Sequence, residues 1–158
     1  RTSYGKYYTD IMRRKLGLRK IMPEDGTLIR DLLDLMAQSG MDYTRFFRAL
    51  GNFSTNGREL NLSPAFGEWE GRYSRRLRLE NSMDSERKPR MDSVNPKYVL
   101  RNYIAEGAIR KAVDEDDYSE IERIRVLLKE PFSEQPGSET YAEPAPAWAR
   151  GLVISCSS

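Results

Sequence analysis

The sequence predicts an all-α protein that ends in an irregular, proline-rich C-terminal arm. Apolar side chains recur at spacings of three and four residues in successive segments, which is the pattern of amphipathic helices. Glycine or proline stands between most of these segments, where helices end. Only residues 152–154, with the sequence LVI, have the character of a short strand. No repeat of solenoid period is present, so a stack of repeated units is excluded.

The N-terminal half predicts three helices. The first runs through the apolar positions up to Leu16 and stops at Gly17. A turn at Asp25–Gly26 precedes the second helix, for which Thr27 is the expected N-cap and Gly40 the end. Asp42 is the expected N-cap of a short third helix. Because the chain opens on an arginine inside an amphipathic pattern, we expect it to be a piece of a longer protein.

Further helices follow a loop-like stretch over residues 51–63. Pro64 fits the first turn of a helix that reaches Leu79. Residues 81–92 form a polar segment with Pro89 inside it, and no helix is predicted there. Asn95 and Pro96 predict the next helix start, as N-cap and first-turn proline. The acidic run 114–117 then precedes a last helix that ends before Pro131. From residue 132 onward, proline and glycine predict an extended arm.

Composition excludes several classes of function. A chain of 158 residues and 18.3 kDa has the length of one domain. It has no histidine and one cysteine, which excludes Ser-His and Cys-His nucleophiles, an internal disulfide and a thiolate zinc site. With 26 basic and 24 acidic residues, no strong field favours nucleic acid or an anionic membrane as partner. No apolar run is long enough to cross a bilayer.

Two charged clusters are candidate sites. The run Asp114–Asp117 lacks the glycine and the glutamate that a calcium loop places at its sixth and twelfth positions, so a solvated turn is favoured. Four arginines near two aromatic residues resemble a nucleic-acid surface: Arg72, Arg75, Arg76 and Arg78, with Trp69 and Tyr73. Glutamates at helical spacing in the same segment favour a solvated face that meets a protein partner. No glycine-rich phosphate-binding motif is present.

Three sequence blocks carry a resemblance to a known family. They are residues 39–48 (SGMDYTRFFR), 93–103 (SVNPKYVLRNY) and 155–158 (SCSS), with residues 14–18 and 146–149 in the same register. In order and spacing they resemble the C-terminal third of the selenoprotein O family. Cys156 stands at the position where some relatives carry selenocysteine.

The resemblance implies an enzyme that this chain represents only in part. The family is kinase-like and transfers AMP from ATP to Ser, Thr or Tyr hydroxyls of other proteins, using Mg or Mn. Its nucleotide-binding and metal-binding residues lie upstream, so we expect no catalytic, cofactor-binding or metal residue here, and an inactive isolated chain. The expected organisation is a helical region over 1–131, packed on the missing N-terminal kinase-like region, and an arm over 132–158. The expected compartment is the bacterial cytoplasm or the eukaryotic mitochondrion.

A second reading from another class stays open. The chain could be a stand-alone helical interaction module whose arginine and aromatic face docks a protein partner. The upstream sequence of the gene product discriminates between the two, because only the family reading requires a kinase-like region there.

Cys156 is the one candidate site residue, with a proposed redox role. A thiol between serines near the chain end suits exchange chemistry better than a buried position. From Trp148, eight residue steps give a reach of at most about 26–29 Å. The resemblance implies a disulfide with an upstream cysteine that lowers activity when oxidised. An inert, solvated tail residue is the alternative.

Overall fold

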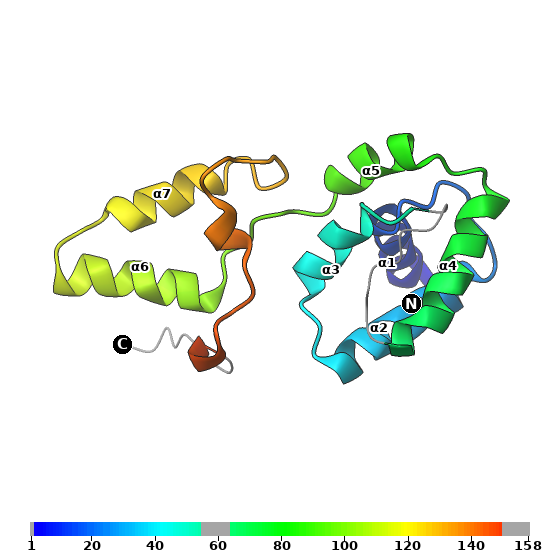
Figure 1. Ribbon diagram of the computed structural model, residues 1–158, viewed down its shortest axis with the longest axis horizontal. Helices are drawn as coiled ribbons and strands as arrows, with labels where there is room; N and C mark the ends of the chain where they lie inside the picture. Colours follow the sequence, from blue (N-terminus) through cyan, green and yellow to red (C-terminus); the bar gives the residue numbers. More distant parts are fainter. Residues whose placement is uncertain (1, 55–63, 150–158) are drawn as a thin grey trace. The chain divides into compact units, whose positions relative to one another are not determined.

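A computed structural model describes residues 2–54 and 64–149, and the regular elements in those ranges are all helices (Figure 1). The all-α class is therefore confirmed for the part of the chain described. The predicted strand at 152–154 and Cys156 lie outside the described residues, as does most of the predicted loop over 51–63. None of the helices in the described ranges is long and apolar enough to cross a membrane.

The chain divides into two compact units, Arg1–Asn95 and Pro96–Ser158. This division differs from the expected boundary at 131/132. Residues beyond 131 bond to the last helix of the second unit: the Gln135 side-chain amide donates to the Leu127 carbonyl, and the Tyr141 hydroxyl donates to Glu120. The first part of the predicted arm is thus built into this unit and carries two short 3-10 helices, η2 (Glu139–Ala142) and η3 (Ala147–Ala149).

The first unit surrounds a core of aromatic and aliphatic side chains. Its elements are α1 (Thr2–Lys15), α2 (Asp25–Ser39), α3 (Tyr43–Leu50), η1 (Pro64–Phe66), α4 (Gly67–Leu79) and α5 (Asp84–Asp92). Helix α1 packs against α2 and α5, α2 against α4, and α3 against α5. Trp69 and Tyr73 stack with ring centroids 5.0 Å apart, and both side chains are buried. Burial of such large rings is the main stabilising contribution in this unit.

The local start and stop signals of the first helices are mostly confirmed. Gly17 ends α1 with φ of +70°, and Gly40 ends α2 with φ of +61°. Asp42 caps α3, because its carboxylate accepts a hydrogen bond of 3.0 Å from the Arg45 backbone N–H. The predicted turn at Asp25–Gly26 and the Thr27 cap are wrong, since α2 already begins at Asp25. Asp25 is buried there because its carboxylate binds Arg76.

Helix α5 was not expected, because its sequence is polar and contains Pro89. A proline inside a helix removes one backbone hydrogen bond and costs about 3 kcal/mol. The compensation is tertiary: Met91 enters the core, and the buried Arg87 guanidinium bonds to Asp84 and to the Phe53 carbonyl. Packing therefore outweighs helix propensity in this segment.

The predicted helix start at Asn95–Pro96 is wrong. Helix α6 (Asn102–Asp114) begins six residues after Pro96, with Arg101 as its N-cap. Asn95 instead ties the chain to the end of α1. Its amide donates to the Lys15 carbonyl at 2.9 Å, and its side-chain oxygen accepts from the Lys15 ammonium at 3.1 Å.

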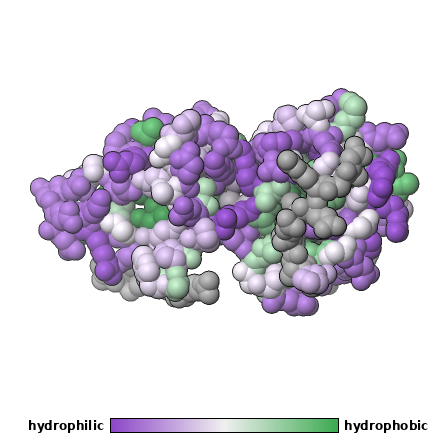
Figure 2. Space-filling model, viewed as in Figure 1, coloured by the Kyte–Doolittle hydropathy of each residue, from purple (hydrophilic) through white to green (hydrophobic). Residues whose placement is uncertain are grey.

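The second unit pairs α6 with α7 (Ser119–Leu127). The acidic run separates these helices as expected, and the Asp117 carboxylate accepts a hydrogen bond from the Ser119 N–H. The buried hydrophobic residues are few in the described part of this unit: Tyr98, Ala108, Ile124, Leu127 and Ala149. Several large apolar side chains remain exposed, and Figure 2 shows hydrophobic residues at the surface of both units.

Candidate functional site

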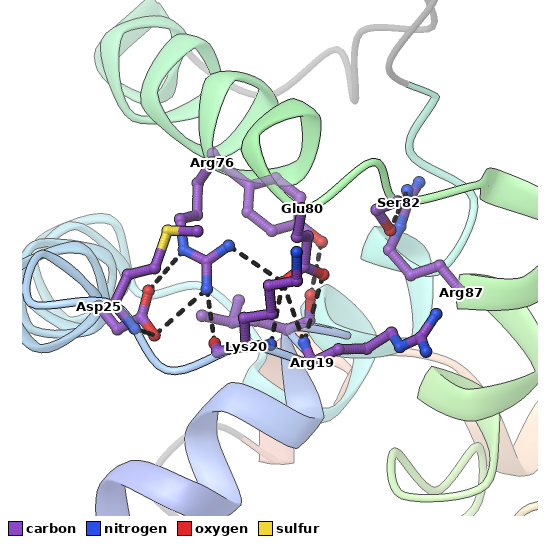
Figure 3. A network of polar contacts seen from close by, with 10 residues as sticks. Arg19, Lys20, Asp25, Arg76, Glu80, Ser82 and Arg87 are labelled. Carbon is purple, nitrogen blue, oxygen red and sulfur yellow. Dashed lines mark hydrogen bonds and ion pairs between the residues drawn. The ribbon is translucent and has the colours of Figure 1, made fainter.

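The densest polar cluster among the described residues is a buried ion network centred on Arg76 of α4 (Figure 3). The Arg76 Nε donates to Asp25 at 2.7 Å, and one terminal nitrogen donates to Glu80 at 3.0 Å. The other terminal nitrogen donates to the Lys20 carbonyl at 2.7 Å. The planar guanidinium thus spans α2, α4 and the loop between α1 and α2, a geometry that lysine does not supply.

Glu80 completes the network from the end of α4. Its carboxylate accepts the backbone N–H groups of Arg19 and Lys20, at distances of 3.1–3.2 Å. One guanidinium therefore lies between two carboxylates, and backbone donors stabilise the surplus negative charge. Burial lowers the pKa of Arg76, but the hydrogen bonds to Asp25 and Glu80 outweigh it and leave the pKa raised. The network fixes the α1–α2 loop and holds Arg76 in its charged form.

The arginine and aromatic cluster expected on α4 is divided by this packing. Trp69, Tyr73 and Arg76 lie on the core face, because their spacing of three and four residues places them on one side of the helix. Arg72 is half-buried and pairs with Asp31 of α2 at 2.7 Å. Arg75 and Arg78 are exposed. The expected solvated face is therefore wrong for its aromatic residues and for Arg76.

The two aromatic residues of this cluster bond to backbone groups. The Tyr73 hydroxyl donates to the Leu16 carbonyl at 2.8 Å, and the Trp69 indole N–H donates to the Leu28 carbonyl at 2.9 Å. Burial raises the pKa of Tyr73 far above its ordinary value. The hydroxyl therefore keeps its proton into the alkaline range and acts as a hydrogen-bond donor to the backbone.

Burial lowers the pKa of Lys15 at the end of α1. Besides its bond to Asn95, its ammonium lies 5.2 Å and 5.1 Å from the ring centroids of Tyr43 and Phe47. Such cation–π contacts favour the charged form. The ammonium is thus held by three neighbours and links α1, α3 and the end of the first unit.

No group of three or more acidic, cysteine or histidine side chains among the described residues is arranged to hold a metal ion. Asp114–Asp117 includes exposed carboxylates at a helix junction. Hydrogen bonds from Ser119 lower the pKa of Asp117. Cys156, the candidate redox residue, lies outside the described residues.

Sequence reasoning found one part of the Arg76 network, the helical spacing between Arg76 and Glu80. It missed Asp25, because the sequence at Asp25–Gly26 predicts a turn. A signal was nevertheless present in the sequence. This acidic residue directly precedes an apolar helix, and that helix has no basic residue at helical spacing on its core face that could pair with it.

Comparison with known proteins gives one consistent answer. The family model described as "Protein adenylyltransferase SelO" matches residues 1–129. A protein nucleotidyltransferase YdiU of Myxococcus xanthus (strain DK1622) is 47% identical over 164 residues, covering 99% of this chain and 33% of the relative. The YdiU proteins of Pseudomonas fluorescens (strain Pf0-1) and Thioalkalivibrio sulfidiphilus (strain HL-EbGR7) are 45% and 47% identical, each over 98% of this chain. The chain spans about a third of the length of these relatives.

Proposed function

Since the chain belongs to the SelO family of protein adenylyltransferases, we propose that the protein of which it is part transfers AMP from ATP to Ser, Thr or Tyr hydroxyls of other proteins. In this reaction the hydroxyl oxygen attacks the α-phosphorus of ATP, a bond forms between them, and pyrophosphate leaves while the hydroxyl proton is lost. The family match over residues 1–129 is the observation that carries the proposal.

This chain is proposed to supply a helical, structural part of that enzyme. Its buried charged groups support this role, since Arg76 and Arg87 are bound by carboxylates and backbone carbonyls of the same unit. ATP and Mg or Mn are proposed to bind residues in the remainder of the protein, and no reaction step is assigned to this chain. Its location at the C-terminal end stays a prediction, as does the compartment.

Exposed apolar side chains on the second unit support the proposal that another protein surface covers it. Val113 is 77% exposed and Ile109 is 45% exposed on α6, one helical turn apart. Val126 of α7 is 52% exposed. We infer that another protein surface covers these exposed apolar groups. We propose that the missing kinase-like region covers these side chains. The second candidate is a separate protein partner, which is what a stand-alone interaction module would require.

Transfer of labelled AMP tests the proposal. The full-length protein that contains this sequence, incubated with α-labelled ATP, Mg or Mn and an acceptor protein, should transfer label to the acceptor. The 158-residue chain alone should transfer none above a protein-free blank. Label on an acceptor with the chain alone would overturn the structural role. No transfer by the full-length protein, with an active relative as positive control, would overturn the proposed activity.

The redox role of Cys156 is a separate proposal about the parent protein. Mass spectrometry of oxidised, non-reduced peptides should find Cys156 joined to one upstream cysteine, and reduction should raise activity. A Cys156→Ala variant should lose this redox response. A Cys156 thiol that stays free under oxidation, or an unchanged response in the variant, would contradict the role.

A further inference from the structure

A pocket of about 370 Å³ in the first unit is bordered by four arginines. Arg13 and Arg14 come from the last turn of α1, Arg19 from the loop that follows, and Arg90 from the last turn of α5. Asp10 and Ser93 also border it. We call it the arginine pocket. None of these side chains belongs to the Arg76 network.

The arginine pocket carries more positive charge than its acidic neighbours neutralise. Asp10 lies 2.6 Å from Arg13, while Glu86 is farther from its arginines, 3.6 Å from Arg19 and 3.9 Å from Arg90. Arg14 is exposed and forms no ion pair with any residue in the described ranges. Four guanidinium groups against two carboxylates leave a local surplus of two positive charges.

Arginines near helix C-termini ordinarily complement the helix dipole and bond to the last carbonyls. Here backbone N–H groups already occupy those carbonyls. Gly17 donates to the Arg14 carbonyl at 3.0 Å, and Leu18 donates to the Arg13 carbonyl at 2.9 Å. Among the four arginines, only Arg90 donates to a helix carbonyl in the described structure, that of Glu86. Helix capping therefore accounts for little of the cluster.

One side of the pocket, at Gly17 and Arg13, is held by close packing. A Cβ atom on Gly17 would lie 2.6 Å from Cγ of Arg87 and 2.9 Å from Cγ of Met91, so the end of α1 is seated directly on α5. The side chain of Arg13 is only 12% exposed. The pocket is therefore preformed at Gly17 and Arg13, which reduces the ordering cost of binding a ligand there, while the side chains of Arg19 and Arg90 are 62% and 39% exposed.

Charge is also distributed unevenly along the chain. Residues 1–95 hold 18 basic and 13 acidic residues, whereas residues 96–158 hold 8 basic and 11 acidic ones. The near-neutral total therefore conceals a basic first unit. A basic unit raises the local concentration of anions near its surface.

We propose that the arginine pocket binds a phosphate-type polyanion, a diphosphate or triphosphate group that is either free or part of a nucleotide. Guanidinium groups donate paired N–H bonds that match phosphate oxygens, and several arginines together favour a multiply charged anion. The pocket volume lies near the lower end of the range for ligand sites, which suits a small ligand. The proposal is independent of AMP transfer, because it uses no residue assigned to that reaction.

Titration calorimetry with inorganic pyrophosphate tests this site, using the 158-residue chain and the full-length protein. We expect saturable binding that weakens about tenfold or more in an R14Q/R90Q double variant. An R30Q/R78Q variant removes two exposed arginines of the same unit outside the pocket, and it should stay within about twofold of the parent chain. Circular dichroism of each variant checks that the fold is retained.

Three further probes identify the source of the anion. In the 158-residue chain, to which no ATP site for AMP transfer is assigned, ATP that binds more tightly than inorganic triphosphate points to a nucleotide, and equal affinity points to the phosphate chain alone; either result supports the site. AMP should bind more weakly than pyrophosphate because it carries one phosphate. The proposal is overturned by absence of saturable pyrophosphate binding up to about 10 mM, by equal weakening in both double variants, or by a glutamate-rich peptide that binds where pyrophosphate does not.

Discussion

Arg76 shows how one residue sets the geometry of the first unit. Its guanidinium contacts a carboxylate of α2, a carboxylate of its own helix and a loop carbonyl, while only about 2% of its side chain is exposed. Replacing all members of a buried ion network by apolar residues changes the stability little. Removing only one partner is costly, because the remaining charges stay buried without compensation.

An Arg76→Met variant should therefore be strongly destabilised. Asp25 and Glu80 would remain buried without their cation, which costs about 3–5 kcal/mol in the free energy of unfolding. Urea denaturation measures the loss. The matched control is Arg78→Met on the exposed side of the same helix, which should change stability by less than about 0.5 kcal/mol. Similar losses in the two variants would show that the network is not a stability determinant.

Because of Tyr73, the free energy of unfolding should fall at alkaline pH. Burial raises its pKa in the folded state, so the folded protein keeps the proton after the unfolded chain loses it. Its contribution is complete below the ordinary tyrosine pKa of about 10, and above that pH it falls by about 1.4 kcal/mol per pH unit. Lys15 acts in the opposite direction: its lowered pKa lets stability rise with pH up to about 10.4 and adds nothing beyond.

The test compares unfolding free energies between pH 9 and 11.5 in two variants. Tyr73→Phe should be less stable at neutral pH, because the hydrogen bond to the Leu16 carbonyl is lost, and should show a flatter alkaline decline. Tyr7→Phe, at a position that is 67% exposed, should keep the slope of the parent chain. An unchanged slope in Tyr73→Phe would assign the alkaline loss to other groups.

At the scale of elements, helix ends that depend on local signals were predicted correctly. The predictions failed where the structure depends on tertiary contacts. Gly17, Gly40 and Asp42 act within a few residues of the chain, so the sequence pattern was sufficient to find them. Asn95 has the chemistry of an N-cap, but its partner Lys15 is 80 residues away. Helix α5 likewise depends on contacts with the core. The ion network joins residues 51 positions apart, and no periodicity in the sequence encodes that pairing.

Alanine variants of two helix-ending glycines distinguish the cost of backbone strain from the cost of steric crowding. Gly17 and Gly40 both have positive φ, but a Cβ at Gly40 would meet no atom within 4 Å. Gly40→Ala should cost about 1–2 kcal/mol for the left-handed backbone alone. Gly17→Ala should cost about 1–3 kcal/mol more, because the new methyl group would overlap the Arg87 and Met91 side chains. Thermal or urea unfolding of both variants measures the difference, and equal costs would refute the close packing of α1 on α5.

At the scale of the whole molecule, the two units differ in the size of their hydrophobic cores. In the described residues, sixteen buried hydrophobic side chains form the core cluster of the first unit, and five are buried in the second. Exposed apolar side chains are correspondingly prominent on α6 and α7. Stability in a chain of this kind is expected to be distributed unevenly, with the better-packed unit opening least often.

Hydrogen exchange should therefore protect the two units to different degrees in the isolated chain. Amides of α2 and α4 should exchange only through unfolding of the first unit, while amides of α6 and α7 should exchange through easier local opening. Mass spectrometry of peptic peptides resolves the units directly.

Trp69, which is 1% exposed, gives a second readout. In a Trp148→Phe variant, tryptophan fluorescence reports on the first unit alone, and it should change at a higher denaturant concentration than the total helix signal does. In the full-length protein, the exchange of α6 and α7 should slow if the missing region covers their exposed apolar side chains. Equal protection of all four helices, with coincident fluorescence and helix transitions, would show instead that the chain unfolds as one cooperative unit.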